Sequence, residues 1–309
     1  MGDSLARAID LLRAGQLVVA PTETVYGLAA DAGNPQAIAQ IFALKARPAF
    51  NPLIAHVASL AMAQDIAYLG PIELRLAARF WPGPLTIVAD RRQPDLPCDL
   101  ACAGLASVAL RMPDHPIMLA LIEGLARPIA APSANRSGRI SPTLPAHVTA
   151  EFGAETPFLL DGGACRIGLE STIIRVAADD VVHILRPGFV TAEMLEAVSH
   201  CPVRPPAPSD DITAPGQLLA HYAPAAPVRL NRHDPSPGDI LIGFGPHSRA
   251  APEWNLSPAG DLAQAAATLY AFLRAADAIG PSAIVIEPIP DHGLGLAIND
   301  RLRRAAHRD

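Results

Sequence analysis

Lysine is nearly absent from this chain. Among its 309 residues Lys45 is the single lysine, and every other basic side chain except histidine is an arginine. Arginine therefore supplies positive charge wherever charge alone is needed, which makes the one ammonium group a candidate for a specific role. The formal net charge of −6 argues against a broad surface that neutralises phosphates, so any contact with nucleic acid is expected to be local or transient.

Cysteine is also scarce. The four cysteines, Cys98, Cys102, Cys165 and Cys201, are too few and too scattered for a disulfide framework. Cys98 and Cys102 are four residues apart and can share a helix face, but no nearby His/Cys pair completes a tetrahedral set. We therefore expect reduced structural thiols and no zinc.

Long apolar runs and glycine-rich nucleotide motifs are missing as well. No apolar run approaches the roughly 20 residues that cross a bilayer, and no N-terminal stretch has the features of a signal peptide. We therefore expect a cytoplasmic protein without a membrane partner. No Walker A sequence exists, and "GFGPHS" and "GLGLAI" are incomplete dinucleotide fingerprints, so a nucleotide would have to be bound without the usual glycine loops.

The apolar pattern that is present indicates an α/β fold. Buried strands are expected at "QLVVAPT", "NPLIAHV", "PLTIVAD", "ASVALRM", "RPIAAPS", "PFLLDGG", "STIIRVA" and "VVHILRP". Helices are expected over residues 3–14, 35–46, 59–80, 114–126 and 144–152. Because the last two strands surround a polar turn, the sheet is expected to be open, twisted and mixed rather than purely parallel.

Proline divides the chain. Seven prolines fall within residues 201–227, which predicts a semi-rigid linker between a first domain at 1–200 and a second domain at 228–309. The linker is longer than two docked domains need, so we expect it to close over the first domain as a lid. The second domain shows strands at "DILIGFG" and "SAIVIEPI" and two helices, the pattern of a small Rossmann-like α/β unit.

Lys45 lies at the end of a predicted helix. Asn34 can cap this helix and Pro35 can open it, and Lys45 follows Ile38, Ile41 and Phe42 on the apolar stripe. The amine is therefore expected on the core-facing side. It either complements the helix C-terminal dipole, which an arginine would do equally well, or packs against a phosphate beside the fork of Arg47.

The stretch "AAPSANRSGRISPT", residues 130–143, is a second candidate. Ser133 and Asn135 alternate with alanine, so in an extended segment their polar groups face the same side, and Ser141 adds a further donor. A loop of this composition is often only a solvated turn. Its position after an apolar strand instead favours a ligand loop.

Further polar groups follow apolar strands. They are found in "PTETVYGL", in "RMPDHP" with Arg111 and in "GLESTII" with Glu170, Ser171 and Thr172. Arg111 either holds a carboxylate or is a surface ion-pair partner, and His56 at the end of "PLIAHV" is either a ligand-binding group or a satisfied core residue. The residues by themselves support an α/β protein with a phosphate-binding cleft.

Taken in order, seven motifs resemble the YrdC-domain family, the L-threonylcarbamoyladenylate synthases. The motifs are "PTETVYGL", "KARPAFNPLIAH", "WPGPLT", "VALRMPDHP", "APSANRSG", "GLESTII" and "LRPG". The segments "APGQLLAHYAP" and "IEPIPDHGLGLAINDRLRRAA" resemble the longer, two-domain form. The resemblance covers nearly the whole chain and implies a YrdC-like sheet followed by a small C-terminal α/β domain.

The resemblance also implies a reaction. In that family L-threonine and bicarbonate give a carbamate that attacks the α-phosphorus of ATP, forming threonylcarbamoyl-AMP and pyrophosphate. A tRNA threonylcarbamoyl transferase complex then moves the group to an adenosine beside the anticodon, so tRNA is an indirect partner. Mg²⁺ is expected with ATP, and the enzyme would be a nucleotidyltransferase.

Site residues follow by motif position. The resemblance implies that the family's Lys/Arg and Ser/Asn pairs fall on Lys45, Arg47, Ser133 and Asn135, which would be the catalytic set and contact ATP. Ser107, where threonine is usual in the family, Ser141, Arg186 and Tyr222 would also contact ATP. Thr22, His56, Arg111, the Ala131 backbone and Ser171 would hold threonine.

The resemblance leaves two rival functions. YrdC-like domains can resemble RNA-binding maturation factors, but the acidic charge and the lack of interleaved aromatic residues weigh against this reading. The related carbamoyl-transfer domain of hydrogenase maturation proteins normally comes with zinc-finger cysteines and acylphosphatase segments. This chain shows neither.

Overall fold

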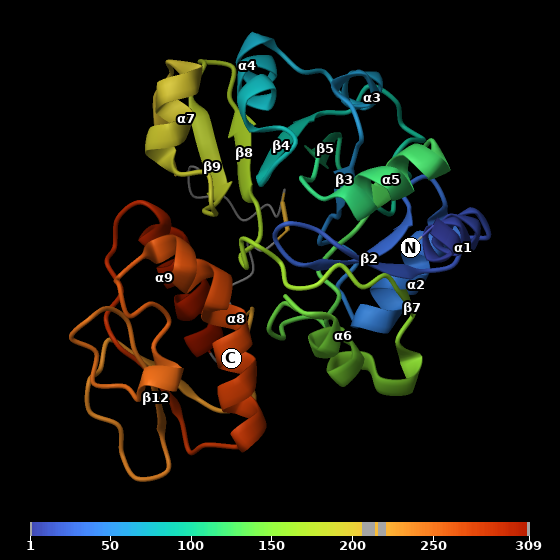
Figure 1. The fold of residues 1–309 in the computed structure, drawn as a ribbon. Coiled ribbons are helices and arrows are strands. Elements are labelled where there is room, and N and C mark those ends of the chain that lie inside the picture. The colour runs from blue at the N-terminus through green and yellow to red at the C-terminus, as the bar shows by residue number, and fades with distance from the viewer. Residues whose placement is uncertain (1, 206–213, 216–220, 308–309) are drawn as a thin grey trace.

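The computed structural model describes residues 2–205, 214–215 and 221–307. These residues form a larger N-terminal domain and a smaller C-terminal domain (Figure 1). The predicted boundaries at 200 and 227 stay predictions, and much of the predicted linker lies outside the described residues. Among the described residues, no helix has both the length and the apolar composition needed to cross a bilayer.

The N-terminal domain is built on a ten-stranded mixed sheet. Its strand order is β10-β9-β8-β4-β5-β3-β6-β2-β1-β7. The expected antiparallel pairing of "STIIRVA" with "VVHILRP" is confirmed by β8 and β9, whereas β4 and β8 are parallel. The strands are β1 (Val18–Pro21), β2 (Tyr26–Asp31), β3 (Ile54–His56), β4 (Leu85–Asp90), β5 (Ser107–Arg111), β6 (Ile129–Ala130), β7 (Phe158–Leu159), β8 (Thr172–Val176), β9 (Val182–Arg186) and β10 (Val203–Arg204).

Local sequence explains where the helices of this domain begin and end. Asn34 caps α2 by accepting from the backbone N–H groups of Gln36 and Ala37, as expected, and Ala46 ends it in the left-handed conformation. The single helix expected over 59–80 is wrong, because the Gly70–Pro71 step divides it and Pro71 opens a new helix. The helices are α1 (Gly2–Arg13), α2 (Pro35–Lys45), α3 (Leu60–Ile66), α4 (Pro71–Phe80), α5 (Pro116–Leu125), α6 (Pro145–Phe152) and α7 (Ala192–Ser199), with a 3₁₀ turn at Gly153–Glu155.

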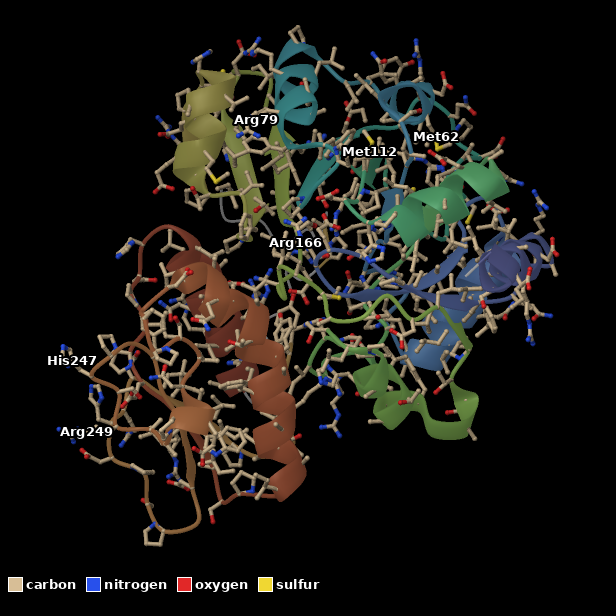
Figure 2. All side chains as sticks on the ribbon, in the orientation of Figure 1. Met62, Arg79, Met112, Arg166, His247 and Arg249 are labelled. Carbon is tan, nitrogen blue, oxygen red and sulfur yellow. The ribbon has the colours of Figure 1, made fainter. Side chains whose placement is uncertain are left out.

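The C-terminal domain has a three-stranded parallel sheet with the order β11-β13-β12. Its strands are β11 (Val228–Leu230), β12 (Ile240–Ile242) and β13 (Ile284–Ile286), and its helices are α8 (Leu262–Ile279) and α9 (Leu294–Ala306), with a 3₁₀ turn at Pro252–Trp254. The two predicted strands and both helices are confirmed, while β11 begins directly after the expected linker. The loop carrying His247 and Arg249 projects away from the N-terminal domain (Figure 2).

The two domains share one apolar core. The C-terminal cluster around Leu269, Leu273 and Ile298 also contains Val25, Ile140 and Leu169 from the N-terminal domain. Helices α8 and α9 lie on the side of the small sheet that faces the N-terminal domain (Figure 1). Because buried apolar surface is continuous across the boundary, the C-terminal domain is docked against the loops that follow the strands of the large sheet.

Candidate functional site

A cleft lies where these loops meet the C-terminal domain. Its walls come from the segments that follow β1, α2 and β6, from β3, from the ends of β5 and β9, from Glu170 before β8, and from the described part of the segment that joins the domains. The lining residues are Thr24, Val25, Arg47, Ile54, His56, Arg111, Ala131, Pro132, Ser133, Glu170, Arg186, Pro215, His221 and Tyr222. Arg47, His56, Arg111, Ala131, Ser133, Arg186 and Tyr222, all predicted from the sequence, are therefore brought together.

Lys45 is buried at the C-terminal end of α2 with a side chain only 2% exposed. Its Nζ donates to the backbone oxygen of Ser133 at 2.5 Å and to that of Asn135. Burial and the neighbouring Arg47 lower the pKa of Lys45 well below its ordinary value, and Glu151 opposes them. The expected core-facing direction is confirmed, and the ammonium fixes the backbone of the Ser/Asn loop while keeping a third donor.

Arg47 follows the helix end and faces the cleft. Its Nη2 donates to Oδ1 of Asn51 at 2.6 Å and to the Pro52 oxygen at 2.8 Å, and its Nε donates to the Asn51 oxygen at 3.1 Å. Burial lowers the pKa of Arg47 to about 10, which still leaves it cationic at neutral pH. These bonds hold the planar guanidinium rigidly, so the cleft carries a fixed positive charge.

The loop from Ser133 to Ser141 wraps around these cations. The backbone of Ser133 pairs with Gly27, and the Asn135 amide donates to the oxygens of Arg136 and Arg139 at 2.7 and 2.9 Å. Oδ1 of Asn135 is buried and has no hydrogen-bond partner. Because an unpaired buried acceptor is costly, this oxygen is well suited to receive a donor from a ligand.

The segment after β1 contributes a buried ion pair that sequence reasoning missed. Arg111 Nη2 lies 2.7 Å from Oε1 of Glu23, and the two side chains are 4% and 1% exposed. Thr22 is 3% exposed and its hydroxyl is engaged locally, accepting from the Thr24 and Val25 N–H groups. Arg111 is thus buried rather than on the surface, and Glu23 compensates its charge.

His56 lies beside Arg111, at the end of β3. Burial and Arg111 lower the pKa of His56 to about 3, so the ring is neutral at physiological pH. Its Nδ1 is buried without a hydrogen-bond partner. A neutral imidazole with an unpaired nitrogen is able to bond a polar ligand without adding charge to the cleft.

The opposite wall is formed by Glu170, which lies just before β8, and by Arg186, which ends β9. Ser171 lies behind this wall, bonded to Arg186. Arg186 donates from Nε and Nη2 to the Ser171 oxygen and from Nη2 to the Ser171 hydroxyl, at 3.0 to 3.1 Å. The Ser171 hydroxyl also lies 2.7 Å from that of Thr86. Ser141 donates to Glu170 Oε1 at 2.5 Å.

The last wall comes from the segment that joins the domains. Tyr222 is 1% exposed, has a positive φ of 62°, and stacks on Tyr270 of α8 with ring centroids 5.7 Å apart. Burial lowers the pKa of the adjacent His221 to about 3, and its Nδ1 has no partner. The described part of the expected linker therefore lines the cleft, and its closing as a lid stays a prediction.

Five predicted residues do not line the cleft, but each is hydrogen-bonded to a residue that does: Thr22, Lys45, Asn135, Ser141 and Ser171. Ser107 lies further away. It begins β5, whereas Arg111 ends it, so the two are roughly 13 Å apart along the strand. Both face the same side as Ala109, which packs near Ala214 of the joining segment. A ligand that contacts Ser107 must therefore extend along this face of the sheet beyond the cleft.

The residues that the structure describes include no group of three or more His, Cys, Asp and Glu side chains close enough to hold a metal ion. The cleft carboxylate of Glu170 is already bonded to Ser141, Tyr270 and Arg301. A divalent cation here fits best when a phosphate ligand supplies most of its oxygen atoms.

Two family models together match nearly the whole chain. The Sua5–YciO–YrdC model, described as "Telomere recombination", matches residues 10–188. A model described as "Threonylcarbamoyl-AMP synthase, C-terminal domain" matches residues 190–307. The sequence therefore resembles one family over both of its domains.

Curated and solved proteins agree with these models. The chain is 39% identical to threonylcarbamoyl-AMP synthase of Bacillus subtilis, with 98% of this chain and 92% of the relative covered. It is 40% identical to threonylcarbamoyl-AMP synthase of Pyrococcus abyssi, with 97% and 93% covered. The crystal structure of P. abyssi Sua5 complexed with L-threonine superposes with a TM-score of 0.87 at 38% identity, covering 98% of this chain and 94% of that one.

Proposed function

Because this chain belongs to the two-domain threonylcarbamoyl-AMP synthase family, we propose that it joins L-threonine, bicarbonate and ATP into threonylcarbamoyl-AMP and pyrophosphate. Family membership over the full length carries this proposal. The arrangement of fixed cations and neutral polar groups in one buried cleft supports it. The alternative of a non-enzymatic RNA-binding factor has no comparable support.

The reaction takes place in two steps. The threonine amine attacks the carbon of bicarbonate, which gives an N-carboxylate, water and a released ammonium proton. An oxygen of that carboxylate then attacks the α-phosphorus of ATP, and the bond to the β-phosphate breaks to release pyrophosphate. Since the attacking oxygen is already anionic, the second step needs positioning and charge stabilisation more than a general base.

In this proposal the polyphosphate of ATP binds on the cationic side of the cleft. The third donor of Lys45 and the fixed guanidinium of Arg47 face the developing negative charge, while Ser133 and Asn135 align the α-phosphate. Arg186, which lines the opposite wall, also contacts the polyphosphate in this proposal. ATP also contacts Ser141 and Tyr222, and its base or ribose extends toward Ser107.

Threonine binds on the side of the cleft that is formed by the ends of β3, β5 and β6. Arg111, neutralised by Glu23, contributes hydrogen bonds rather than a free charge, and neutral His56 accepts from the threonine hydroxyl or amine. Thr22, the Ala131 backbone and Ser171 complete this subsite. Glu23 belongs to it as well, because it sets the charge that Arg111 presents.

Mg²⁺ would bind to the cleft together with ATP. The phosphate oxygens and water would be its main ligands, and the ion would supply charge neutralisation of the leaving pyrophosphate. The product is a mixed anhydride that water hydrolyses, so the burial of the cleft beneath Tyr222 protects it. The reaction belongs to the cytoplasm, where a tRNA threonylcarbamoyl transferase complex would use the product to modify tRNA.

Pyrophosphate release tests the proposal. With ATP present, release should require both L-threonine and bicarbonate, because the nucleophile does not exist until they combine. Equal release with either one omitted would show that the chain is not a synthase of this kind. Tight, salt-sensitive RNA binding without turnover would instead favour the RNA-binding alternative.

A further inference from the structure

The carboxylate of Glu170 is buried beside the cleft and makes three side-chain hydrogen bonds. Its Oε1 accepts from the Ser141 hydroxyl at 2.5 Å, and its Oε2 accepts from the Tyr270 hydroxyl and from Arg301 Nε, both at 2.8 Å. Tyr270 lies on α8 and Arg301 on α9, so one carboxylate of the N-terminal domain is bonded to both helices of the C-terminal domain. Glu170 also lines the cleft itself.

Arg301 is fully buried and has every nitrogen engaged. In addition to Glu170, it donates from Nη1 to Asp300 at 2.6 Å and from Nη2 to the Pro187 oxygen at 3.0 Å. Its guanidinium carbon lies 5.1 Å from the ring centroid of Tyr222, a distance suited to a cation–π contact. A lysine would not make these contacts together, because its single nitrogen lacks the planar fork.

The two N-terminal partners of Arg301 are the chain neighbours of Ser171 and Arg186, which are bonded to each other. Glu170 directly precedes Ser171, and Pro187 directly follows Arg186. The segments are in tight contact, since a Cβ on Gly188 would lie 2.4 Å from the Thr172 nitrogen and 2.7 Å from the Glu170 oxygen. Arg301 therefore holds both segments next to Ser171 and next to Arg186, which lines the cleft.

Charge gives Arg301 a second role. An uncompensated carboxylate at position 170 would repel the polyphosphate of ATP from the wall of a buried cleft, where screening is weak. Arg301 and Arg186 are the cations that face this carboxylate, and Arg186 also faces the cleft. Compensation by Arg301 leaves Arg186 available to a phosphate.

We propose that Arg301 of the C-terminal domain is a positioning residue for the synthase reaction, acting through Glu170 and Pro187 to fix Ser171 and Arg186 and to neutralise the cleft carboxylate. The inference rests on the proposed function. It assigns the C-terminal domain a direct part in completing the active site. Arg301 itself does not touch the substrates.

Arg301→Met tests the inference, with Arg304→Met as the matched control. Arg304 lies one turn further along α9 and binds the same Asp300 carboxylate through its Nε at 3.1 Å. At a temperature where melting curves show both variants fully folded, Arg301→Met should lower kcat/KM for ATP roughly tenfold to hundredfold, as expected when reacting groups are misplaced. Arg304→Met should stay close to wild type.

A purely structural role predicts a different result. It would lower the melting temperature of Arg301→Met while the folded protein kept the wild-type kcat/KM, and this outcome would overturn the inference. If Arg301→Met does not fold, Tyr270→Phe serves instead. It removes only one bond to Glu170, and it should lower kcat/KM in the same direction; unchanged kinetics would again overturn the inference.

The charge role has its own test. Adding Glu170→Gln to Arg301→Met removes the uncompensated carboxylate. The glutamine amide oxygen accepts from one of the Ser141 and Tyr270 hydroxyls, and the NH2 group can donate to the other. The double variant should therefore bind a non-hydrolysable ATP analogue more tightly than Arg301→Met alone, and equal or weaker binding would refute the charge role. Wild-type protein that makes no threonylcarbamoyl-AMP would refute the proposed function instead, so the two failures are distinguishable.

Discussion

Replacement of the single lysine is the perturbation with the clearest expected result. Lys45→Met keeps the apolar stem and removes the ammonium, so the Asn135 oxygen loses this donor and the Ser133 oxygen keeps only the Asn135 N–H. Hydrogen bonds to charged groups contribute about 1.5–3 kcal/mol each. The cost of burying the ammonium, which also lowers the pKa of Lys45, offsets part of that sum.

The net destabilisation should therefore be about 2–3 kcal/mol, which corresponds to a melting temperature lower by roughly 5 °C in a chain of this length. Gln36→Met on the exposed side of the same helix is the matched control and should melt like the wild type. Thermal unfolding followed by circular dichroism measures both shifts. An unchanged melting temperature for Lys45→Met would contradict the role assigned to the two bonds.

Lys45→Arg separates charge from shape. The variant keeps a cation, but the larger planar guanidinium does not fit the space between the two carbonyl groups and the phosphate. We expect a folded protein that loses most of its threonine- and bicarbonate-dependent pyrophosphate release. Wild-type turnover by Lys45→Arg would show that any cation serves at this position and would refute the reasoning.

Three further predictions concern the rest of the cleft. Ser133→Ala and Asn135→Ala should weaken ATP binding more than threonine binding in calorimetry, and the reverse order would assign the loop to threonine. Burial alone would raise the pKa of Glu170, but Arg301 and the other partners lower it from 4.5 to about 2. The ionised carboxylate therefore adds on the order of 3 kcal/mol to the free energy of unfolding above pH 4.5, and this stabilisation is lost as the pH falls toward 2. Urea unfolding should therefore show a steeper loss of stability over that range in the wild type than in Glu170→Gln, and equal slopes would contradict this pairing. Tyr222→Ala should form less threonylcarbamoyl-AMP per ATP consumed, because water reaches the anhydride; an unchanged ratio would mean that Tyr222 does not exclude water.

Features that depend on neighbouring residues could be predicted from the sequence. Asn34 and Pro35 fix the start of α2, and the apolar stripe places Lys45 on the buried side of that helix. The alternation in "STIIRVA" and "VVHILRP" likewise indicates the β8–β9 hairpin. In each case the physical cause lies within a few residues, so periodicity and capping are sufficient.

Features that depend on distant partners could not be predicted. The acceptors of Lys45 are backbone oxygens almost 90 positions away, and a sequence does not indicate which carbonyl groups a side chain will meet. Glu23 lies in the polar stretch "PTETVYGL", and nothing near it in the sequence indicates that its partner is Arg111. Arg301 lies 131 positions from Glu170 and on a helix of another domain, so only the docked structure shows its contact with the cleft.

Identification of the product tests the proposed reaction most directly. The protein would be incubated with ATP, L-threonine and ¹³C-labelled bicarbonate, and the nucleotides separated at once and examined by mass spectrometry. The proposed reaction predicts threonylcarbamoyl-AMP that carries the label, in an amount that tracks pyrophosphate before hydrolysis. Release of pyrophosphate with only unlabelled AMP, or no reaction at all with the three substrates present, would contradict it.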